Sequence, residues 1–217
     1  MQSVAEAEAV AAIGVDHVGV TPSRRGLPGE VDEGTATDIC AALTGLATSV
    51  ALSVETEAEA VVQMATRVQP DILHLCGPPG EMNPASVAEL RRSLPGIGIM
   101  QAIAVTGPEA VETALSYEAA VDFLILDSVT PDVPGVGAAG TVHDWAVSAA
   151  IVAAVDVPVV LAGGLSPDNV ADAIETVHPW GVDSLTCTNR PLPSGAFEKD
   201  LGLVQRFCRS AKGEDVL

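Results

Sequence analysis

The carboxyl group of Asp127 is well placed in this sequence for acid–base chemistry, because it directly follows the apolar run at 123–126. A strand that is buried up to a terminal acid would hold the carboxyl group where solvation is poor, and poor solvation raises its pKa. Such a group can act as a general acid near neutral pH. An aspartate after a strand can also simply cap a turn, so the residue alone leaves both interpretations open.

Two glycine-rich segments follow Asp127 and could bind an anion. Three glycines lie between residues 135 and 140, and Gly163 and Gly164 end an apolar run shortly before an expected helix. Backbone N–H groups in such turns can be directed at a phosphate group. A flexible lid at 135–140 and a packing turn at 163–164 are the alternatives.

Short β-branched runs alternate with Ala- and Glu-rich segments along the whole chain, which predicts strands that alternate with helices. The expected strands are 15–20, 49–54, 71–76, 98–105, 121–127, 157–163 and 181–188. The expected helices are 4–13, 35–47, 56–68, 84–94, 108–117, 144–154, 167–177 and 198–211.

Seven strands and eight helices at regular spacing favour a (βα)8 barrel of the TIM type that lacks its first β-strand. The composition agrees, since 48% of the residues are hydrophobic and only 3% are aromatic, as parallel strands under Ala-rich helices require. An open doubly wound sheet would also accept these elements, but no GxGxxG turn follows an early strand. We expect one domain over residues 1–217. In a barrel the active site lies at the carboxyl ends of the strands.

The net charge of −19 argues against nucleic acid and anionic membranes as partners. It is typical of a protein from a high-salt cytoplasm or of an ordinary acidic bacterial enzyme. No CxxC pair or metal-ligand spacing occurs among the four cysteines, and the N-terminal residues do not resemble a signal peptide. We therefore expect a soluble cytoplasmic protein with reduced thiols, without a metal or another cofactor.

Several segments, in order, resemble the phosphoribosylanthranilate isomerase family of tryptophan biosynthesis. They are AVAAIGVDHVGV (9–20), DILHLCG (71–77), LILDS (124–128), GVGAAGTVHDW (135–145), VPVVLAGGLSPDNVADAI (157–174) and HPWGVD (178–183). The resemblance implies a TIM barrel and an Amadori rearrangement of a phosphoribosyl-amine, which is an aldose–ketose isomerisation. It implies a small phosphorylated sugar as substrate.

The resemblance also implies roles for individual residues. Asp127 would be the general acid, and Gly163, Gly164 and Thr186 would bind the phosphate group. Arg24 or Arg25 would bind the substrate carboxylate, for which a guanidinium group is suited.

The family's catalytic base is a cysteine on a first strand that has no counterpart here. Within the chain, Cys76, Cys187 and His74 are weak candidates for the base. The missing strand predicts three possible situations: a longer natural chain, a stable open barrel, or a gap closed by rearrangement or by a second copy in a homo-oligomer. Two further functions stay open: an inert phosphosugar-binding or regulatory relative, or, favoured by His74, Cys76 and Gln101, an isomerase for another phosphorylated substrate.

Overall fold

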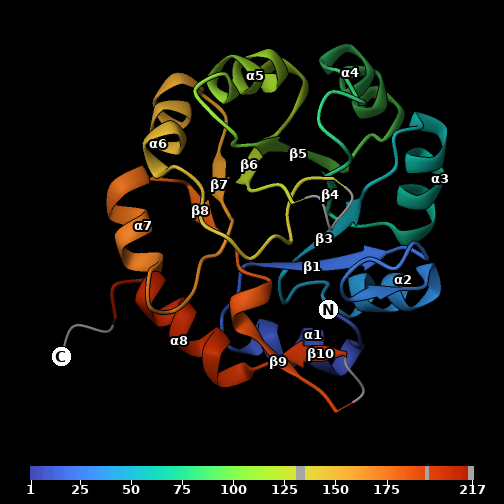
Figure 1. The fold of residues 1–217 in the computed structure, drawn as a ribbon. Helices are drawn as coiled ribbons and strands as arrows, with labels where there is room; N and C mark the ends of the chain where they lie inside the picture. Colours follow the sequence, from blue (N-terminus) through green and yellow to red (C-terminus); the bar gives the residue numbers. More distant parts are fainter. Residues whose placement is uncertain (131–134, 194–195, 215–217) are drawn as a thin grey trace.

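The structure is a computed structural model of the 217-residue chain, and it describes residues 1–130, 135–193 and 196–214. Eight parallel strands form one curled sheet, and helices surround it on the outside (Figure 1). The strands are β1 (His17–Pro22), β2 (Glu30–Val31), β3 (Thr48–Ser53), β4 (Ile72–Leu75), β5 (Gly98–Ala104), β6 (Phe123–Asp127), β7 (Val159–Leu161) and β8 (Gly181–Val182).

From β2 to β8, one α-helix lies between each two successive strands and crosses back over the outside of the sheet, whereas one more helix precedes β1 and another follows the last strand. They are α1 (Val4–Ala12), α2 (Glu33–Ala42), α3 (Ala58–Val68), α4 (Pro84–Ser93), α5 (Ala110–Tyr117), α6 (Trp145–Ala154), α7 (Val170–Val177) and α8 (Leu201–Ala211). Short 3₁₀ helices occur at η1 (Glu118–Ala120) and η2 (Thr186–Thr188). Asn83 and Asp200 begin α4 and α8, respectively, by accepting hydrogen bonds from backbone N–H groups of the first turn.

The strand order is β2-β1-β3-β4-β5-β6-β7-β8, so this TIM-barrel type of sheet has two ends. In the described part of the chain no ladder joins β8 to β1 or β2, and the sheet therefore remains a half-barrel. The gap lies on the side where a first strand was expected to be missing.

Alternating side chains divide the apolar residues into two clusters. On β6, Leu124 and Leu126 pack with helix residues in the larger cluster, whereas Ile125 faces the inside of the curl in a smaller one. The buried members of the smaller cluster come from strands, strand ends and the loop residue Val136. Asp127 therefore lies on the inner side of the sheet, at the carboxyl end of its strand.

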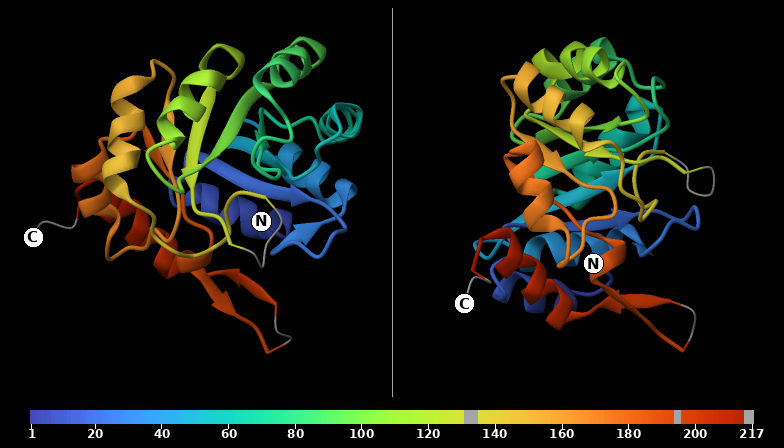
Figure 2. Two further views of the ribbon diagram at one scale, coloured as in Figure 1. Left: turned by 45° about the horizontal axis from the view of Figure 1, so that its top comes forward. Right: turned by 60° about the vertical axis from the view of Figure 1, so that its left-hand side comes forward.

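All seven expected strands are present, but the end of the last one was wrong. The expected strand at 181–188 ends at Val182 and turns into η2, because its neighbour β7 ends at Leu161 and offers no longer ladder. The sequence also gave no signal for β2 or for the antiparallel hairpin of β9 (Asn189–Pro191) and β10 (Phe197–Lys199), which projects from the body (Figure 2). The expected helix at 198–211 consequently begins later, at Leu201.

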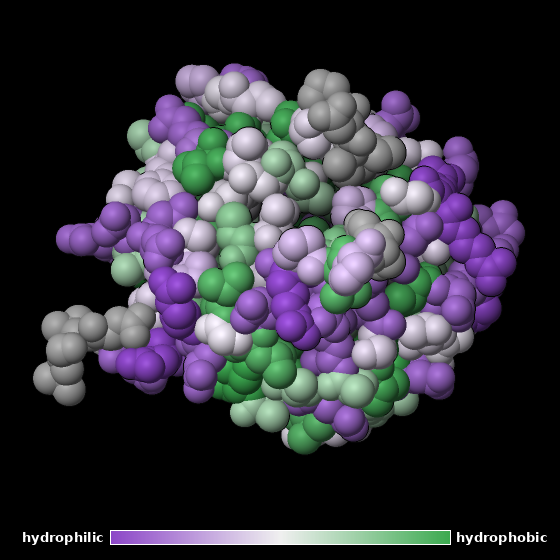
Figure 3. Space-filling view, turned by 60° about the horizontal axis from the view of Figure 1, so that its bottom comes forward, coloured by the Kyte–Doolittle hydropathy of each residue, from purple (hydrophilic) through white to green (hydrophobic). Residues whose placement is uncertain are grey.

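Polar side chains cover much of the surface, as the net charge of −19 requires. In the space-filling view, hydrophilic residues spread over the visible face and hydrophobic ones gather in smaller areas between them (Figure 3). No helix in the described ranges has the length and apolar character needed to cross a membrane.

The hydroxyl group of Tyr117 on α5 is buried and donates a hydrogen bond to the Met82 carbonyl oxygen at 2.7 Å, which ties α5 to the segment before α4. We expect Tyr117→Phe to lower the free energy of unfolding by about 1 kcal/mol, because the buried carbonyl group loses its partner. Urea unfolding measures this. Leu115→Ala is the control, since this side chain of the same helix is 43% exposed; equal stability of Tyr117→Phe and the wild type would contradict the prediction.

Candidate active site

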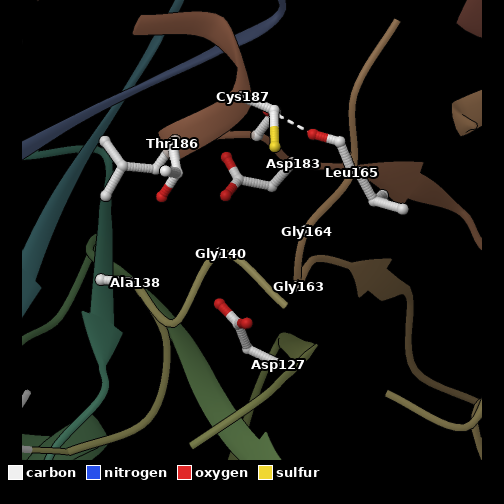
Figure 4. A pocket seen from close by; sticks show the side chains of 11 residues that line it. Asp127, Ala138, Gly140, Gly163, Gly164, Leu165, Asp183, Thr186 and Cys187 are labelled. Carbon is white, nitrogen blue, oxygen red and sulfur yellow. Dashed lines mark hydrogen bonds between the residues drawn. The ribbon is translucent and has the colours of Figure 1, made fainter. Parts of the chain in front are cut away.

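A pocket opens at the carboxyl ends of the last strands of the sheet, where a barrel is expected to hold its site. Its described lining comes from the last residue of β6 and from the segments that follow β6, β7 and β8 (Figure 4). The lining residues are Asp127, Ala138, Gly140, Gly163, Gly164, Leu165, Asp183, Ser184, Leu185, Thr186 and Cys187. The carboxyl groups of Asp127 and Asp183 approach this space from opposite sides.

Asp127 is held in place by the backbone of its own strand end. Its Oδ1 accepts a hydrogen bond from the Ser128 N–H group at 2.7 Å. Burial raises the pKa of Asp127 to about 7, and the negative charge of Asp183 adds to this rise, whereas the bond from Ser128 opposes it. A pKa in this range leaves part of the Asp127 carboxyl groups protonated at neutral pH, which suits a general acid.

Asp183 is the second carboxyl group of the pocket, and the sequence did not single it out. It follows β8 directly, but the expected strand at 181–188 placed it inside a strand rather than at a strand end. Its side chain lies deep in the molecule and yet is exposed through the pocket. Poor solvation raises the pKa of Asp183, and the nearby Lys199 ammonium group works against that rise.

Both predicted glycine segments contribute to the pocket. Gly163 and Gly164 line it after β7, and Gly140 lines it from the loop after β6. Gly164 has φ +64°, and a Cβ atom there would lie only 2.7 Å from the carbonyl carbon of Thr141. A side chain at this position is therefore excluded by both conformation and space, which explains why glycine is needed.

The loop after β6 is fastened to the strand ends by three hydrogen bonds. The Gly137 N–H group donates to Ser128 O at 2.9 Å, and the Val136 N–H group donates to Cys76 O at 2.9 Å. The Ser128 hydroxyl group donates to Thr141 O at 2.7 Å. The described part of the loop, from residue 135, is thus hydrogen-bonded to the strand ends, and it supplies Ala138 and Gly140 to the wall of the pocket.

Thr186 and Cys187 lie at the pocket, on η2. Cys187 is half-buried, and it lines the same pocket as Asp183 and Thr186 (Figure 4). Of the three candidates for a base, Cys187 lines the pocket, whereas Cys76 and His74 are not among its described lining residues.

Cys76 and His74 lie inside the curl of the sheet. The Cys76 thiol donates to Ser53 O at 3.4 Å, and burial raises its pKa to about 12, so the thiol stays protonated at neutral pH. Burial lowers the pKa of His74 to about 4, and among the residues that the structure describes its buried Nε2 has no hydrogen-bond partner. Gln101 shares a strand face with Ile99 and Ile103, which pack in the cluster that contains helix residues, so its side chain does not face the inside of the curl.

Arg24 and Arg25 are exposed on the loop after β1, outside the described lining of the pocket. Arg25 forms an ion pair with Glu55 at 2.6 Å. Hydrogen bonds from the Thr35 N–H and hydroxyl groups lower the pKa of Asp32, and the charge of Arg24 adds a smaller contribution. The structure does not bring either guanidinium group to Asp127.

Two further side chains near the pocket received no role from the sequence. The Lys199 ammonium group donates to the turn that follows β8. His143 lies beside Asp127 and Gly163, with its Nε2 2.8 Å from the Ser148 hydroxyl oxygen. Among the described residues, no group of three or more His, Cys, Asp or Glu side chains is arranged to hold a metal ion.

The curled parallel sheet with a site at its carboxyl ends places the chain among TIM-barrel proteins. Residues 3–186 match the sequence profile of N-(5'phosphoribosyl)anthranilate (PRA) isomerase. The chain belongs to this family.

Individual relatives agree with the family assignment. The N-(5'-phosphoribosyl)anthranilate isomerase of Haloarcula marismortui is 35% identical over 206 residues, which cover 94% of this chain and 90% of that protein. The isomerase of Halobacterium salinarum is 39% identical over 208 residues, with 94% and 88% covered. The crystal structure of the Thermotoga maritima isomerase aligns with a TM-score of 0.79 at 26% identity and covers 98% of this chain and 96% of that one.

We expect Asp127→Asn to stabilise the protein at alkaline pH. An aspartate whose pKa is raised by folding contributes stability that is full below its unfolded pKa of about 4 and is lost as the pH rises through the folded pKa of about 7. Asparagine does not ionise. The free energy of unfolding of the variant should therefore exceed that of the wild type by an amount that grows from about pH 4 and reaches on the order of 2–4 kcal/mol by about pH 8.

Urea unfolding at several pH values measures this gain. The control is Asp38→Asn, which changes an exposed carboxylate on α2 and should leave the pH dependence unaltered. A constant difference between Asp127→Asn and the wild type across this pH range would show that Asp127 is not shifted.

Proposed function

We propose that the protein is an isomerase that acts on N-(5'-phosphoribosyl)anthranilate in tryptophan biosynthesis, in the cytoplasm. The carrying observation is the Asp127 carboxyl group, with its pKa raised to about 7, in a pocket between two glycine-containing walls of a chain that belongs to this family. An acid that is partly protonated at neutral pH suits the ring opening that starts an Amadori rearrangement.

In the proposed mechanism, the phosphate group is bound at the pocket wall by polar groups of Gly163, Gly164 and Thr186. Asp127 gives its proton to the ring oxygen while the bond between that oxygen and C1 breaks and an iminium group forms. A base then takes the proton from C2, and the electron pair moves to form an enolamine. The enolamine tautomerises to the aminoketone, so the product is an isomer of the substrate and no cofactor is required.

The described pocket contains few side chains that could act as the base that takes the proton from C2. Cys76 is a protonated thiol at neutral pH, and His74 is buried inside the curl. Cys187 lines the same pocket as Asp127, and we propose it as the base. For the substrate carboxylate we propose Arg24 rather than Arg25, because Glu55 already holds Arg25.

A second candidate function is an inert relative that binds a phosphosugar without converting it. The set of ionisable groups favours this alternative, because the described lining of the pocket contains two carboxyl groups and the Cys187 thiol but no imidazole or amino side chain that could take the proton from C2. An isomerase for another phosphorylated substrate is the third possibility, but the Gln101 side chain, which does not face the inside of the curl, gives it no support.

Turnover of phosphoribosylanthranilate, followed by the loss of its anthranilate fluorescence, tests the proposed function. We expect the wild type to convert the substrate. The rate of Asp127→Asn should be lower on the order of 10²–10⁴-fold, because the variant lacks the general acid. The exposed-site variant Asp38→Asn is the control. Binding of the substrate without turnover would favour the inert relative, and an unchanged rate in Asp127→Asn would exclude Asp127 as the acid.

We also propose that a second copy of the chain covers the gap between β8 and β1, because strand edges with unpaired N–H and C=O groups favour pairing with another chain. Light scattering after size-exclusion chromatography should then give about twice the mass of 22.0 kDa for one chain. A monomer at micromolar concentration would contradict the assembly.

A further inference from the structure

The described pocket has a charge problem if it is to bind phosphate. Two of its lining residues are acids, Asp127 and Asp183, and none of those that the structure describes carries a basic side chain. A phosphate dianion would face at least one carboxylate at short range, where repulsion is strong because solvent screens it poorly. A positive group near the pocket must therefore offset Asp183.

Lys199 lies directly behind the pocket wall formed by the turn after β8. Its Nζ donates to Ser184 O at 3.2 Å, to Leu185 O at 2.9 Å and to the Thr188 hydroxyl oxygen at 2.7 Å. All three acceptors belong to one turn of the chain, and two of the three residues line the pocket. The three donors of the ammonium group are thereby used on this turn.

The backbone of Lys199 is fixed independently of that turn. Lys199 pairs with Asn189 in the β9–β10 hairpin, and its N–H group donates to Glu6 Oε1 of α1 at 2.7 Å. The side chain thus extends from a firm base, and its position does not depend on a ligand in the pocket.

The direction of the carbonyl groups determines the direction of the amide groups next to them. In a trans peptide the N–H bond points opposite to the C=O bond. When the carbonyl oxygens of Ser184 and Leu185 point at Lys199, the N–H groups of Leu185 and Thr186 point away from it, and Lys199 itself is not part of the lining. These N–H groups then become available to an anion on the other side of the turn.

The charge of Lys199 also acts on Asp183. The two groups interact electrostatically: the ammonium group opposes the rise in the pKa of Asp183, and the carboxylate of Asp183 opposes the fall in the pKa of Lys199. Lys199 thus reduces the negative field of Asp183 in the pocket.

We propose that Lys199 is the positioning residue of the phosphate site, whose ammonium group holds the 184–188 turn with its N–H groups toward the ligand and offsets the charge of Asp183. The inference rests on the proposed function, because it assumes that the pocket takes a phosphate group. It adds a residue from the β9–β10 hairpin, which lies outside the described lining.

Binding of inorganic phosphate, measured by ³¹P NMR titration of the full chain, tests this role. We expect Lys199→Met to weaken phosphate binding on the order of tenfold or more, since it removes a unit charge near the site. Lys199→Arg should retain most of the affinity, and Lys199→Gln, which keeps a hydrogen-bond donor without the charge, should be weakened as well. The matched control is Lys212→Met at the only other lysine of the chain, whose Nζ donates to Gly14 O.

Salt dependence separates the charge from a purely structural effect. The fall in affinity with increasing salt should be smaller in Lys199→Met and Lys199→Gln than in the wild type, whereas a variant that only loosens the fold would keep the same slope. Melting temperatures show which variants are folded, and Lys199→Gln decides the question if Lys199→Met does not fold.

Two negative results would be distinguishable. Equal phosphate affinity in the wild type and in a folded, uncharged variant at position 199 would overturn the role of Lys199 and leave the proposed function in place. A folded wild type that binds no phosphate would overturn the phosphate site itself, and with it both the proposed function and the role of Lys199.

Discussion

Two carboxyl groups that share one poorly solvated pocket are the constraint on which the rest of this site depends. Asp127 ends β6 and Asp183 follows β8, and the charge of Asp183 helps to raise the pKa of Asp127. One neighbouring group opposes the rise in pKa at each carboxyl group. The Ser128 N–H group does so at Asp127, and the Lys199 ammonium group does so at Asp183. The same poor solvation that destabilises the charged form of Asp127 keeps a proton available at neutral pH.

Most of the fold could be predicted from the sequence because parallel strands buried on both faces leave continuous apolar runs. Asp127 was identifiable for the same reason, since it stands where such a run stops. Asp183 was hidden because the strand before it has only two residues, and the β-rich composition of 184–188 extended the expected strand past it. The length of β8 depends on its neighbour β7, and the residues at 181–188 do not indicate how long β7 is.

Lys199 and the ion pair of Arg25 were hidden for a different reason. Both depend on contacts between distant segments: Lys199 reaches the 184–188 turn only because the β9–β10 hairpin replaces the start of the expected helix at 198–211. Likewise, Arg25 meets Glu55 across 30 positions of the chain. Spacing and residue type give no signal for partners that tertiary structure brings together. The resemblance, which implied that Arg24 or Arg25 binds the substrate carboxylate, could not show that Arg25 is engaged by Glu55.

The described pocket takes its whole lining from residues 127–187, although the sheet that supports it begins at residue 17. β1 to β5 and their helices therefore support a pocket whose described lining lies in one continuous stretch of the chain, whereas the two proposed outlying contributors, Arg24 and Lys199, lie before and after that stretch. Substitutions before residue 127 can alter stability, surface charge or assembly without placing a new atom in the pocket. The lining of this pocket could thus persist while the first half of the sequence changes, and a change in what the pocket itself contacts would begin in the loops after β6, β7 and β8.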